Sequence, residues 1–399
     1  MIRLASGLVI VLIVLTWFPM TVIATPDTLD YTLELYFDES WTHYHSYEEI
    51  VLGILTLESS GIAKVVDIGE SVEGQTIWAI KISDDPNIED EQENEILFVG
   101  LHHAREWISA EVPYYLAVKF VEEYGVNSTV KNLIDNSELW IVPVLNPDGL
   151  EYSRSQVFDL ESENNNSRFW RKNRAVNSDG SHGVDLNRNY GTTSWGEDIA
   201  EGCWDGCDHP NHEPYWGPSA FSEPETCAIR DLVLDDSRDF IGALSYHSYG
   251  QLIGYPWGNT SDPIPEANMM NTIGQEMSDL IKDVHGRHYE VLQAGNWYVT
   301  VGDMVDWVYE ACRIPAYTIE LRPGNEDYDP VYFELSDNEI LGTCEENWPA
   351  AFHFINEVIG MEDSTGILPE SWLLIIIGTP ILIVLVVIIA AKKIRTNYV

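Results

Sequence analysis

The residues best suited to binding a metal ion lie in the segment from His102 to Trp107. There His103 and Glu106 are spaced as His-x-x-Glu, and a tight turn can aim their imidazole and carboxylate at one ion. The segment directly follows the apolar run Ile96 to Gly100, which has the pattern of a strand buried on both faces. The same spacing also arises by chance from a surface histidine beside a solvated glutamate, so this interpretation needs support from other parts of the chain.

Two more reactive side chains come at or near the ends of later strands. The chain from Phe240 to Tyr246 is typical of a strand that delivers His247 at its C-terminal end. The chain from Ala316 to Leu321 is typical of another strand, which places Glu320 near its end. Open α/β sheets build their sites just beyond the carboxyl ends of strands, so this placement favours a functional site there.

The elements that must position these residues alternate between strands and helices. Strands are expected at residues 76–82, 96–100, 139–145, 240–246 and 316–321, and helices at residues 108–124, 223–234, 267–284 and 336–359. Asn146 to Gly149 has the composition of a turn. Alternation with little polar patterning in the strands predicts an α/β fold whose sheet is covered on both faces. The long polar segments Ser153 to Gly183 and Trp195 to Pro218 are expected to be loops around a site.

Several ordered motifs together resemble the zinc metallocarboxypeptidases of the carboxypeptidase A family. Besides the segment from His102 to Trp107 they are Asn146 to Gly149, Arg168 to Arg174, Gly183 to Tyr190, His247 to Tyr249, Tyr298 with Gly302 to Trp307, and Thr318 to Leu321. The resemblance runs from about Tyr36 to about Ile359. It implies a single globular domain in which a central mixed, twisted β-sheet is flanked by helices on both faces.

The resemblance implies that His103, Glu106 and His247 bind one Zn²⁺ per chain. Two imidazoles and one carboxylate leave a fourth position for water, which is the arrangement of a catalytic zinc site. Asp185 matches the carboxylate that holds a ligand histidine by its other ring nitrogen. The alternative for Asp185 is an aspartate that only stabilises a turn.

The resemblance also implies two catalytic roles. Glu320 resembles the general base that takes a proton from the attacking water and passes it to the leaving amine. Arg171 resembles the cation that stabilises the oxyanion of the tetrahedral intermediate. The alternative for Glu320 is a structural ion pair with Arg322.

Another group of residues resembles the substrate-binding side chains of the family. Asn187 and Arg188 resemble the clamp for a terminal carboxylate, because a guanidinium matches a carboxylate in two bonds. This implies an exopeptidase acting on peptides or proteins with a free C-terminus. Tyr298 resembles the mobile tyrosine that closes over the bound end, although it could instead be a core aromatic residue. Three residues resemble contacts to substrate further from the cut: Arg105, Ser248 and Tyr249.

Side-chain preference is expected to depend on Val305 and Asp303. The family's pocket-floor position falls on Val305, and an apolar residue there resembles the carboxypeptidase A type, which favours apolar ends. Asp303 resembles the carboxypeptidase T type, which accepts both apolar and basic ends. Broad specificity with an apolar bias follows.

The composition excludes one class of partner. The chain of 399 residues carries a net charge of −44, which would repel phosphates, so nucleic-acid binding is not expected. A solvated acidic surface that keeps the protein soluble accounts for this charge.

Five cysteines allow disulfides if the protein is extracellular. One bridge is expected among Cys203, Cys207 and Cys227, and Cys312 could pair with Cys344. The sequence does not fix the pairing. Alternatively, the first two cysteines could hold a metal together with the nearby histidines, His209 and His212.

The N-terminal end reads as a secretory signal peptide over residues 1–24. Arg3 precedes the apolar run Leu8 to Phe18, and Ala24 ends a stretch suited to cleavage. The run is too short for a comfortable membrane span, although an uncleaved anchor is the alternative.

The C-terminal end reads as a membrane anchor. Trp372 to Ala391 is uncharged and long enough to cross a bilayer, and the basic residues that follow are expected to stay cytoplasmic. The expected organisation is a catalytic domain at 25–360, a linker at 361–371, a transmembrane helix at 372–391 and a cytoplasmic tail at 392–399. The protein is then expected at the cell surface as a single-pass membrane protein.

Two other functions fit parts of this pattern. A catalytically inactive cell-surface protein on the same fold could bind peptides, but it would need no general base. An amidohydrolase of the same fold could act on cell-wall peptides, although the expected carboxylate clamp favours a free α-carboxylate.

Overall fold

A computed structural model describes residues 41–88, 93–197, 207–324, 333 and 335–365. The chain divides after Gly360 into a large unit and a short C-terminal one. The predicted signal peptide, transmembrane helix and cytoplasmic tail lie outside the described residues. Within the described ranges, no helix has the length and apolar character needed to cross a membrane.

The large unit is built on a mixed sheet, as expected. Its strands in the described part are β1 (Ala63–Glu70), β2 (Thr76–Ile82), β3 (Asn94–Val99), β4 (Ser137–Val142), β5 (Phe240–Gly250), β6 (Leu252–Tyr255), β7 (Glu290–Gln293) and β8 (Ala316–Gly324). They lie in the order β1-β2-β4-β3-β5-β8-β6-β7. The central strands β4, β3, β5 and β8 run parallel to one another, and β1 and β2 pair antiparallel with their neighbours. At the other end of the sheet, β6 pairs antiparallel with β8 and parallel with β7.

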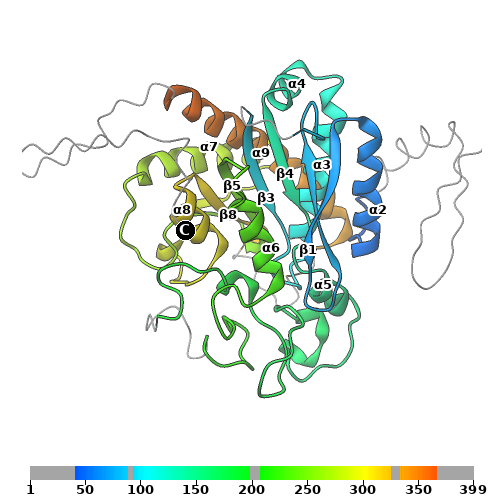
Figure 1. Cartoon of the computed structure of the whole chain (residues 1–399), viewed down its shortest axis with the longest axis vertical. Helices are drawn as coiled ribbons and strands as arrows, with labels where there is room; N and C mark the ends of the chain where they lie inside the picture. Colours follow the sequence, from blue (N-terminus) through cyan, green and yellow to red (C-terminus); the bar gives the residue numbers. More distant parts are fainter. Residues whose placement is uncertain (1–40, 89–92, 198–206, 325–332, 334, 366–399) are drawn as a thin grey trace, which may run out of the picture. The chain divides into compact units, whose positions relative to one another are not determined.

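Helices cover both faces of this sheet (Figure 1). The described α-helices are α2 (Tyr47–Leu57), α3 (Ile108–Tyr124), α4 (Ser128–Ile134), α5 (Pro147–Arg154), α6 (Pro224–Val233), α7 (Ala267–His285), α8 (Met304–Cys312) and α9 (Asp337–Thr365). On one face, α6 and α8 pack with Leu97, Val99 and Trp140 in an apolar cluster. On the other face, Tyr317 contacts both α7, through the carbonyl of Met270, and α9, through the ring of Phe354.

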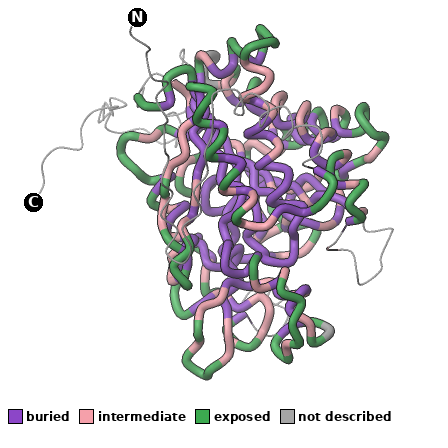
Figure 2. Tube along the Cα trace, turned by 90° about the vertical axis from the view of Figure 1, so that its right-hand side faces the viewer, coloured by how far each residue is buried: buried purple, intermediate pink, exposed green. Residues whose placement is uncertain are grey.

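The buried residues follow the strands and the inner sides of the helices, and the exposed ones lie on the outer turns and loops (Figure 2). Every residue of β4 is buried, as is almost all of β5. The continuous apolar runs read from the sequence are therefore the strands at the centre of the sheet, where both faces are covered. The predicted α/β fold with two covered faces is confirmed.

Several predicted boundaries are wrong. Asn146 does not close a turn: its side-chain oxygen accepts a hydrogen bond from the backbone N–H of Gly149, and it caps the start of α5. β5 does not stop at Tyr246 but continues to Gly250, so His247 lies inside the strand. α9 continues beyond Ile359 to Thr365, into the segment expected to be a linker.

The cysteines differ from the expectation in part. Cys207 is disulfide-bonded, which removes it as a metal ligand. Cys227, Cys312 and Cys344 are free thiols, so the suggested bridge between Cys312 and Cys344 is wrong.

Candidate active site

The chain turns sharply between β3 and α3. Gly100 follows β3, and a side chain there would come within 2.2 Å of the carbonyl oxygen of Ser109, so only glycine fits. Leu101 has a φ of 53°, a left-handed conformation that is uncommon for a residue with a side chain. This turn brings His103 and Glu106 together, as the His-x-x-Glu spacing predicts, and places both next to His247 of β5.

His103, Glu106 and His247 converge on one buried point, with one potential ligand atom from each lying within 4.8 Å of the others. Glu106 Oε1 lies 2.8 Å from His103 Nδ1, and Glu106 Oε2 lies 3.1 Å from His247 Nδ1. The two Nδ1 atoms are 3.2 Å apart. The three residues come from the β3–α3 turn and from β5, neighbouring strands of the sheet.

This donor set fits a zinc ion. Two nitrogens bound to one tetrahedral zinc at about 2.0–2.1 Å are roughly 3.3 Å apart, close to the observed spacing of the Nδ1 atoms. Burial opposes the charge on Glu106, but the two histidines hold the pKa of its carboxyl below its usual range, so it is ionised and able to bind a cation. Burial lowers the pKa of His247, which favours the neutral imidazole that a metal requires.

Asp185 links the metal-binding cluster to Arg171. Its Oδ1 lies 3.1 Å from His103 Nε2, which leaves Nδ1 of that ring free to face the cluster. Its Oδ2 accepts a hydrogen bond of 2.8 Å from Arg171 Nε. Burial alone would raise the pKa of Asp185, but Arg171 and His103 hold it well below its usual range. Asp185 is therefore a buried carboxylate with two specific partners rather than a turn residue alone.

Arg171 is held as a cation beside the cluster. Its Nη1 lies 3.8 Å from Glu106 Oε1. Burial works against its charge, but the carboxylates of Asp185 and Glu106, with a smaller contribution from Glu213, raise the pKa of the guanidinium above its ordinary value. A fixed positive charge therefore lies within reach of any group bound at the cluster.

Glu320 lies in β8 directly opposite His247 of β5 in the register of the sheet. Burial raises the pKa of its carboxyl well above the usual range, and Glu106 adds to this, while Arg171 and Arg188 oppose it. The alternative ion pair with Arg322 is wrong, because Arg322 instead donates a 2.9 Å hydrogen bond from Nε to Glu346.

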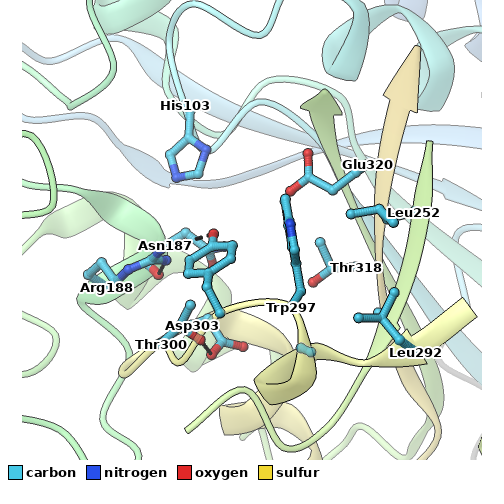
Figure 3. A pocket seen from close by; sticks show the side chains of 13 residues that line it. His103, Asn187, Arg188, Leu252, Leu292, Trp297, Thr300, Asp303, Thr318 and Glu320 are labelled. Atoms are coloured by element: carbon cyan, nitrogen blue, oxygen red, sulfur yellow. Dashed lines mark hydrogen bonds between the residues drawn. The ribbon is translucent and has the colours of Figure 1, made fainter. Parts of the chain in front are cut away.

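A cavity opens next to the cluster, and Figure 3 shows how its side chains lie. His103 and Glu320 are at one end, and Thr300 and Asp303 lie toward the other. The cavity is lined by His103, Asn187, Arg188, Leu252, Gly254, Leu292, Ala294, Trp297, Tyr298, Thr300, Asp303, Thr318 and Glu320. Figure 3 shows Arg188 and Asn187 on the side opposite Leu252, Thr318 and Leu292.

Arg188 and Tyr298 both line this cavity and contact each other. Arg188 Nη2 lies 3.3 Å from the hydroxyl of Tyr298, and Arg188 Nη1 donates a 2.6 Å hydrogen bond to the carbonyl of Asn187. The side chain of Asn187 lies 3.3 Å from His247 Nε2 and accepts a hydrogen bond from the backbone N–H of Met304. Three expected substrate-binding residues are thus brought together beside the expected metal ligands. Because Tyr298 lines the cavity, it is not a core residue.

Comparison with known proteins agrees with this geometry. Residues 51–350 match the family described as zinc carboxypeptidase (Peptidase_M14). The chain belongs to the zinc carboxypeptidase family. It is 33% identical over 315 residues to carboxypeptidase B of Astacus astacus, covering 77% of this chain and 94% of that protein. It is 30% identical over 317 residues to carboxypeptidase A1 of Bos taurus, covering 77% and 68% of the two chains.

Solved structures agree with the sequence matches. The crystal structure of the carboxypeptidase A from Helicoverpa armigera has a TM-score of 0.70 and 27% identity, covering 84% of this chain and 81% of the other. The chain is therefore a zinc-dependent metallocarboxypeptidase, a hydrolase with one Zn²⁺ per chain, as predicted.

One of the two residues expected to set specificity in this zinc carboxypeptidase does not line the cavity. Val305 belongs to α8 and is buried in the apolar cluster between this helix and the sheet. It is not among the described residues that line the cavity, so its role as the pocket floor stays a prediction. Asp303 does line the cavity: its Oδ1 caps α8 at the N–H of Asp306, and its Oδ2 accepts a 2.9 Å hydrogen bond from Thr300.

Three predicted substrate contacts of the zinc carboxypeptidase form a separate wall. Ser248 donates a 3.1 Å hydrogen bond from its backbone N–H to Glu106. The ring of Tyr249 packs edge-on against Phe333 at 5.0 Å between centroids. The guanidinium of Arg105 lies 4.3 Å from the centre of the same Phe333 ring. These residues border the metal-binding cluster but do not line the cavity.

Sequence reasoning missed several residues around this site. Trp297, Leu252, Leu292 and Thr318 line the cavity. Thr318 could have been found, because it lies two residues before Glu320 on the same strand and so shares its face. The ring of His102 stacks on His247 at 5.2 Å, and its Nε2 lies 2.9 Å from the hydroxyl of Tyr190, so it supports a ligand rather than facing the cluster.

Proposed function

We propose that His103, Glu106 and His247 hold the zinc ion of this carboxypeptidase, and that Glu320 and Arg171 carry out the reaction beside it. The observation that carries this proposal is the convergence of the three ligand atoms within 4.8 Å, beside a cavity lined by His103, Glu320 and Arg188. Asp185 then orients His103 by accepting a hydrogen bond from its Nε2–H.

The chain's own residues perform defined steps in this proposal. A bound zinc ion would polarise the scissile carbonyl and lower the pKa of a water molecule. Glu320 takes a proton from the attacking water and delivers it to the nitrogen of the leaving amine. Arg171 stabilises the negative charge that develops on the carbonyl oxygen, an effect worth about 3–4 kcal/mol for one preorganised donor. Because Asp185 fixes the guanidinium through Nε, the remaining nitrogens are free to face the substrate.

The substrate in this proposal is a peptide or protein with a free C-terminus. Arg188, with Asn187, binds the terminal carboxylate, because a planar guanidinium matches it in two bonds. Tyr298, whose hydroxyl already lies 3.3 Å from Arg188, closes over the bound end. The terminal side chain then enters the cavity toward Thr300 and Asp303.

The cavity favours broad specificity with an apolar bias. Leu252, Leu292 and Trp297 offer apolar surface to the terminal side chain. Asp303 supplies one carboxylate that a basic terminal residue can approach. Both oxygens of Asp303 already accept hydrogen bonds, so it tolerates an apolar neighbour without being left unpaired.

We also propose that the enzyme is secreted and held at the cell surface. The support comes from the sequence: a signal peptide at 1–24, and an uncharged span at 372–391 followed by the basic tail 392–399. The catalytic domain at 25–360 then faces the exterior. Fractionation of cells that express the full chain tests this, because carbonate washing should leave the protein in the membrane pellet. Recovery in the soluble fraction would contradict the anchor.

The catalytic proposal is tested with matched peptides that carry either a free or an amidated C-terminus, with and without a chelator. The full chain should remove terminal residues one at a time from the free peptides only, and chelation should abolish this. Glu320→Gln should keep zinc and lose roughly 10²- to 10⁴-fold in kcat. The control Glu290→Gln changes an exposed glutamate on nearby β7 and should leave kcat unchanged. Equal cleavage of amidated peptides would remove the proposed role of Arg188.

A further inference from the structure

Two partly exposed carboxylates, those of Glu163 and Glu213, form ion pairs with Arg105 next to the metal-binding cluster. Arg105 Nη1 lies 3.2 Å from Glu163 Oε2 and 3.1 Å from Glu213 Oε1, and it also donates to the carbonyl of Phe169 at 3.2 Å. The two glutamates lie far from Arg105 in the chain but meet at the same guanidinium nitrogen. The two carboxylates share one guanidinium nitrogen, and Glu213 also lies within electrostatic range of Arg171 and Lys172.

Exposure decides which of these charges a substrate meets. The side chain of Arg105 is only 8% exposed, whereas Glu163 is 57% and Glu213 is 35% exposed. The guanidinium is covered on one side by the ring of Phe333. An approaching peptide therefore contacts carboxylate oxygens rather than the cation.

Arg168 is a further cation close to Arg105, and its contacts on this side are with backbone carbonyls. Arg168 donates from Nη1 to the carbonyl of Arg105 and from Nη2 to the carbonyl of Phe333. Its guanidinium also lies 3.6 Å from the centre of the Trp107 ring. It is buried and directed at backbone oxygens, so it presents no charge to the surface.

The position of this acidic pair defines which part of a substrate would reach it. Arg105 immediately precedes Glu106, and the Phe333 ring that covers it also contacts Tyr249, which follows Ser248. Neither glutamate lines the cavity that receives the terminal residue. A peptide whose end fills that cavity therefore runs past the metal-binding cluster and lays its earlier residues along this wall.

We propose that Glu163 and Glu213 form a subsite for a cationic side chain, Lys or Arg, located upstream of the residue that is removed. This deepens the proposed function and rests on it. The carboxylates would attract the cation, and the rings of Phe333 and Tyr249 offer aromatic surface beside it. The enzyme then selects substrates by an upstream positive charge, independently of the terminal side chain.

The test uses the full-length enzyme and short peptides with one common apolar terminal residue and a free C-terminus. Lys, Gln or Glu is placed in turn at the second, third and fourth residue from the end. At one of these positions Lys should raise kcat/KM about fivefold over Gln, the upper range for a partly exposed ion pair, and Glu should lower it. The ratio of kcat/KM for the Lys and Gln peptides should fall toward one at roughly 0.5 M salt, because exposed charges are screened.

The double variant Glu163→Gln/Glu213→Gln should abolish the Lys preference while cleaving the Gln peptide at an unchanged rate. The control Glu48→Gln removes one negative charge from an exposed position on α2 and should keep the preference. If the double variant does not fold, the salt titration of the unmodified enzyme decides. Three results would overturn the subsite: a wild-type ratio of kcat/KM for the Lys and Gln peptides near one, a ratio that does not change with salt concentration, or an elevated ratio in the double variant. Loss of all exopeptidase activity in the unmodified enzyme would instead overturn the proposed function.

Discussion

Replacing Asp185 by Asn separates the two tasks of this carboxylate. Two donors, His103 Nε2 at 3.1 Å and the backbone N–H of Asn187 at 3.0 Å, converge on Oδ1. Among the described residues, the donor to Oδ2 is Arg171 Nε, at 2.8 Å. The amide oxygen of Asn should therefore occupy the Oδ1 position. Its NH₂ group then faces the N–H of Arg171, where no hydrogen bond can form.

The magnitude follows from which contacts survive. Losing a hydrogen bond to a charged group costs about 1.5–3 kcal/mol, which is roughly 10- to 150-fold if Arg171 acts in the transition state. Losing the partner of a ligand histidine typically weakens metal binding by about 10- to 100-fold. Asp185→Asn keeps the contact to His103, so we expect a small loss of zinc affinity and a large loss of kcat. Asp185→Ala removes the contacts to both His103 and Arg171, so it should lower both the zinc affinity and kcat.

The assay measures zinc affinity by competition with a chromogenic chelator, and kcat/KM at saturating zinc for the same preparations. Thermal melting of each variant checks that the fold is intact. Equal zinc loss in the Asn and Ala variants, with wild-type activity of the Asn variant once zinc is saturating, would show that Asp185 does not position Arg171.

Further predictions concern substrate binding and stability. Arg188→Lys should lower kcat/KM for free peptides by roughly 10- to 100-fold, because a single ammonium cannot bind a carboxylate in two parallel bonds; an unchanged value would argue against the clamp. Burial raises the pKa of Glu225 from its usual value of 4.5 to about 7. The stability gained from its protonated form is therefore fully present below a pH of about 4.5 and is lost as the pH rises through 7. Denaturant titrations at pH 5 and 8 should show a decrease of at most about 3 kcal/mol from this group, absent in Glu225→Gln. Lys81 and Glu138 form a buried ion pair at 2.7 Å, so Lys81→Met should cost about 3–5 kcal/mol of unfolding free energy, whereas adding Glu138→Met should recover part of it.

The sequence predicted the site better than the elements around it. His103, Glu106 and His247 meet as expected because they lie just beyond β3 or near the carboxyl end of β5, and neighbouring parallel strands end at one edge of a sheet. Asp185 joins them from a loop, at the start of a short 3-10 helix. The continuous apolar runs locate these strands, and the sheet register then places the residues on them side by side.

The misses have physical causes. The sequence predicts a turn at the start of α5 because Asn, Pro, Asp and Gly favour turns and also helix starts, and only the packing of the following residues decides between them. β6 and β7 were not expected because strands of four residues give too little alternation to detect. Val305, whose role as the pocket floor stays a prediction, packs inside because α8 turns its apolar face toward the sheet.

The acidic pair of Glu163 and Glu213 beside Arg105 could not be predicted from the sequence alone. Glu163 and Glu213 lie in long polar segments without periodicity, where sequence patterns give no contacts. Only the fold shows that both reach Arg105.

The sheet ends at β1, an edge strand with a register shift between Asp67 and Gly69. Lys64 and Glu70 add further charges to the same short strand. A free edge is normally a template on which another chain can add a strand. Here a second molecule would meet an interrupted ladder and, with 65 acidic against 21 basic residues in each copy, strong mutual repulsion. Crowded copies of this enzyme should therefore resist aggregation through β-strand pairing.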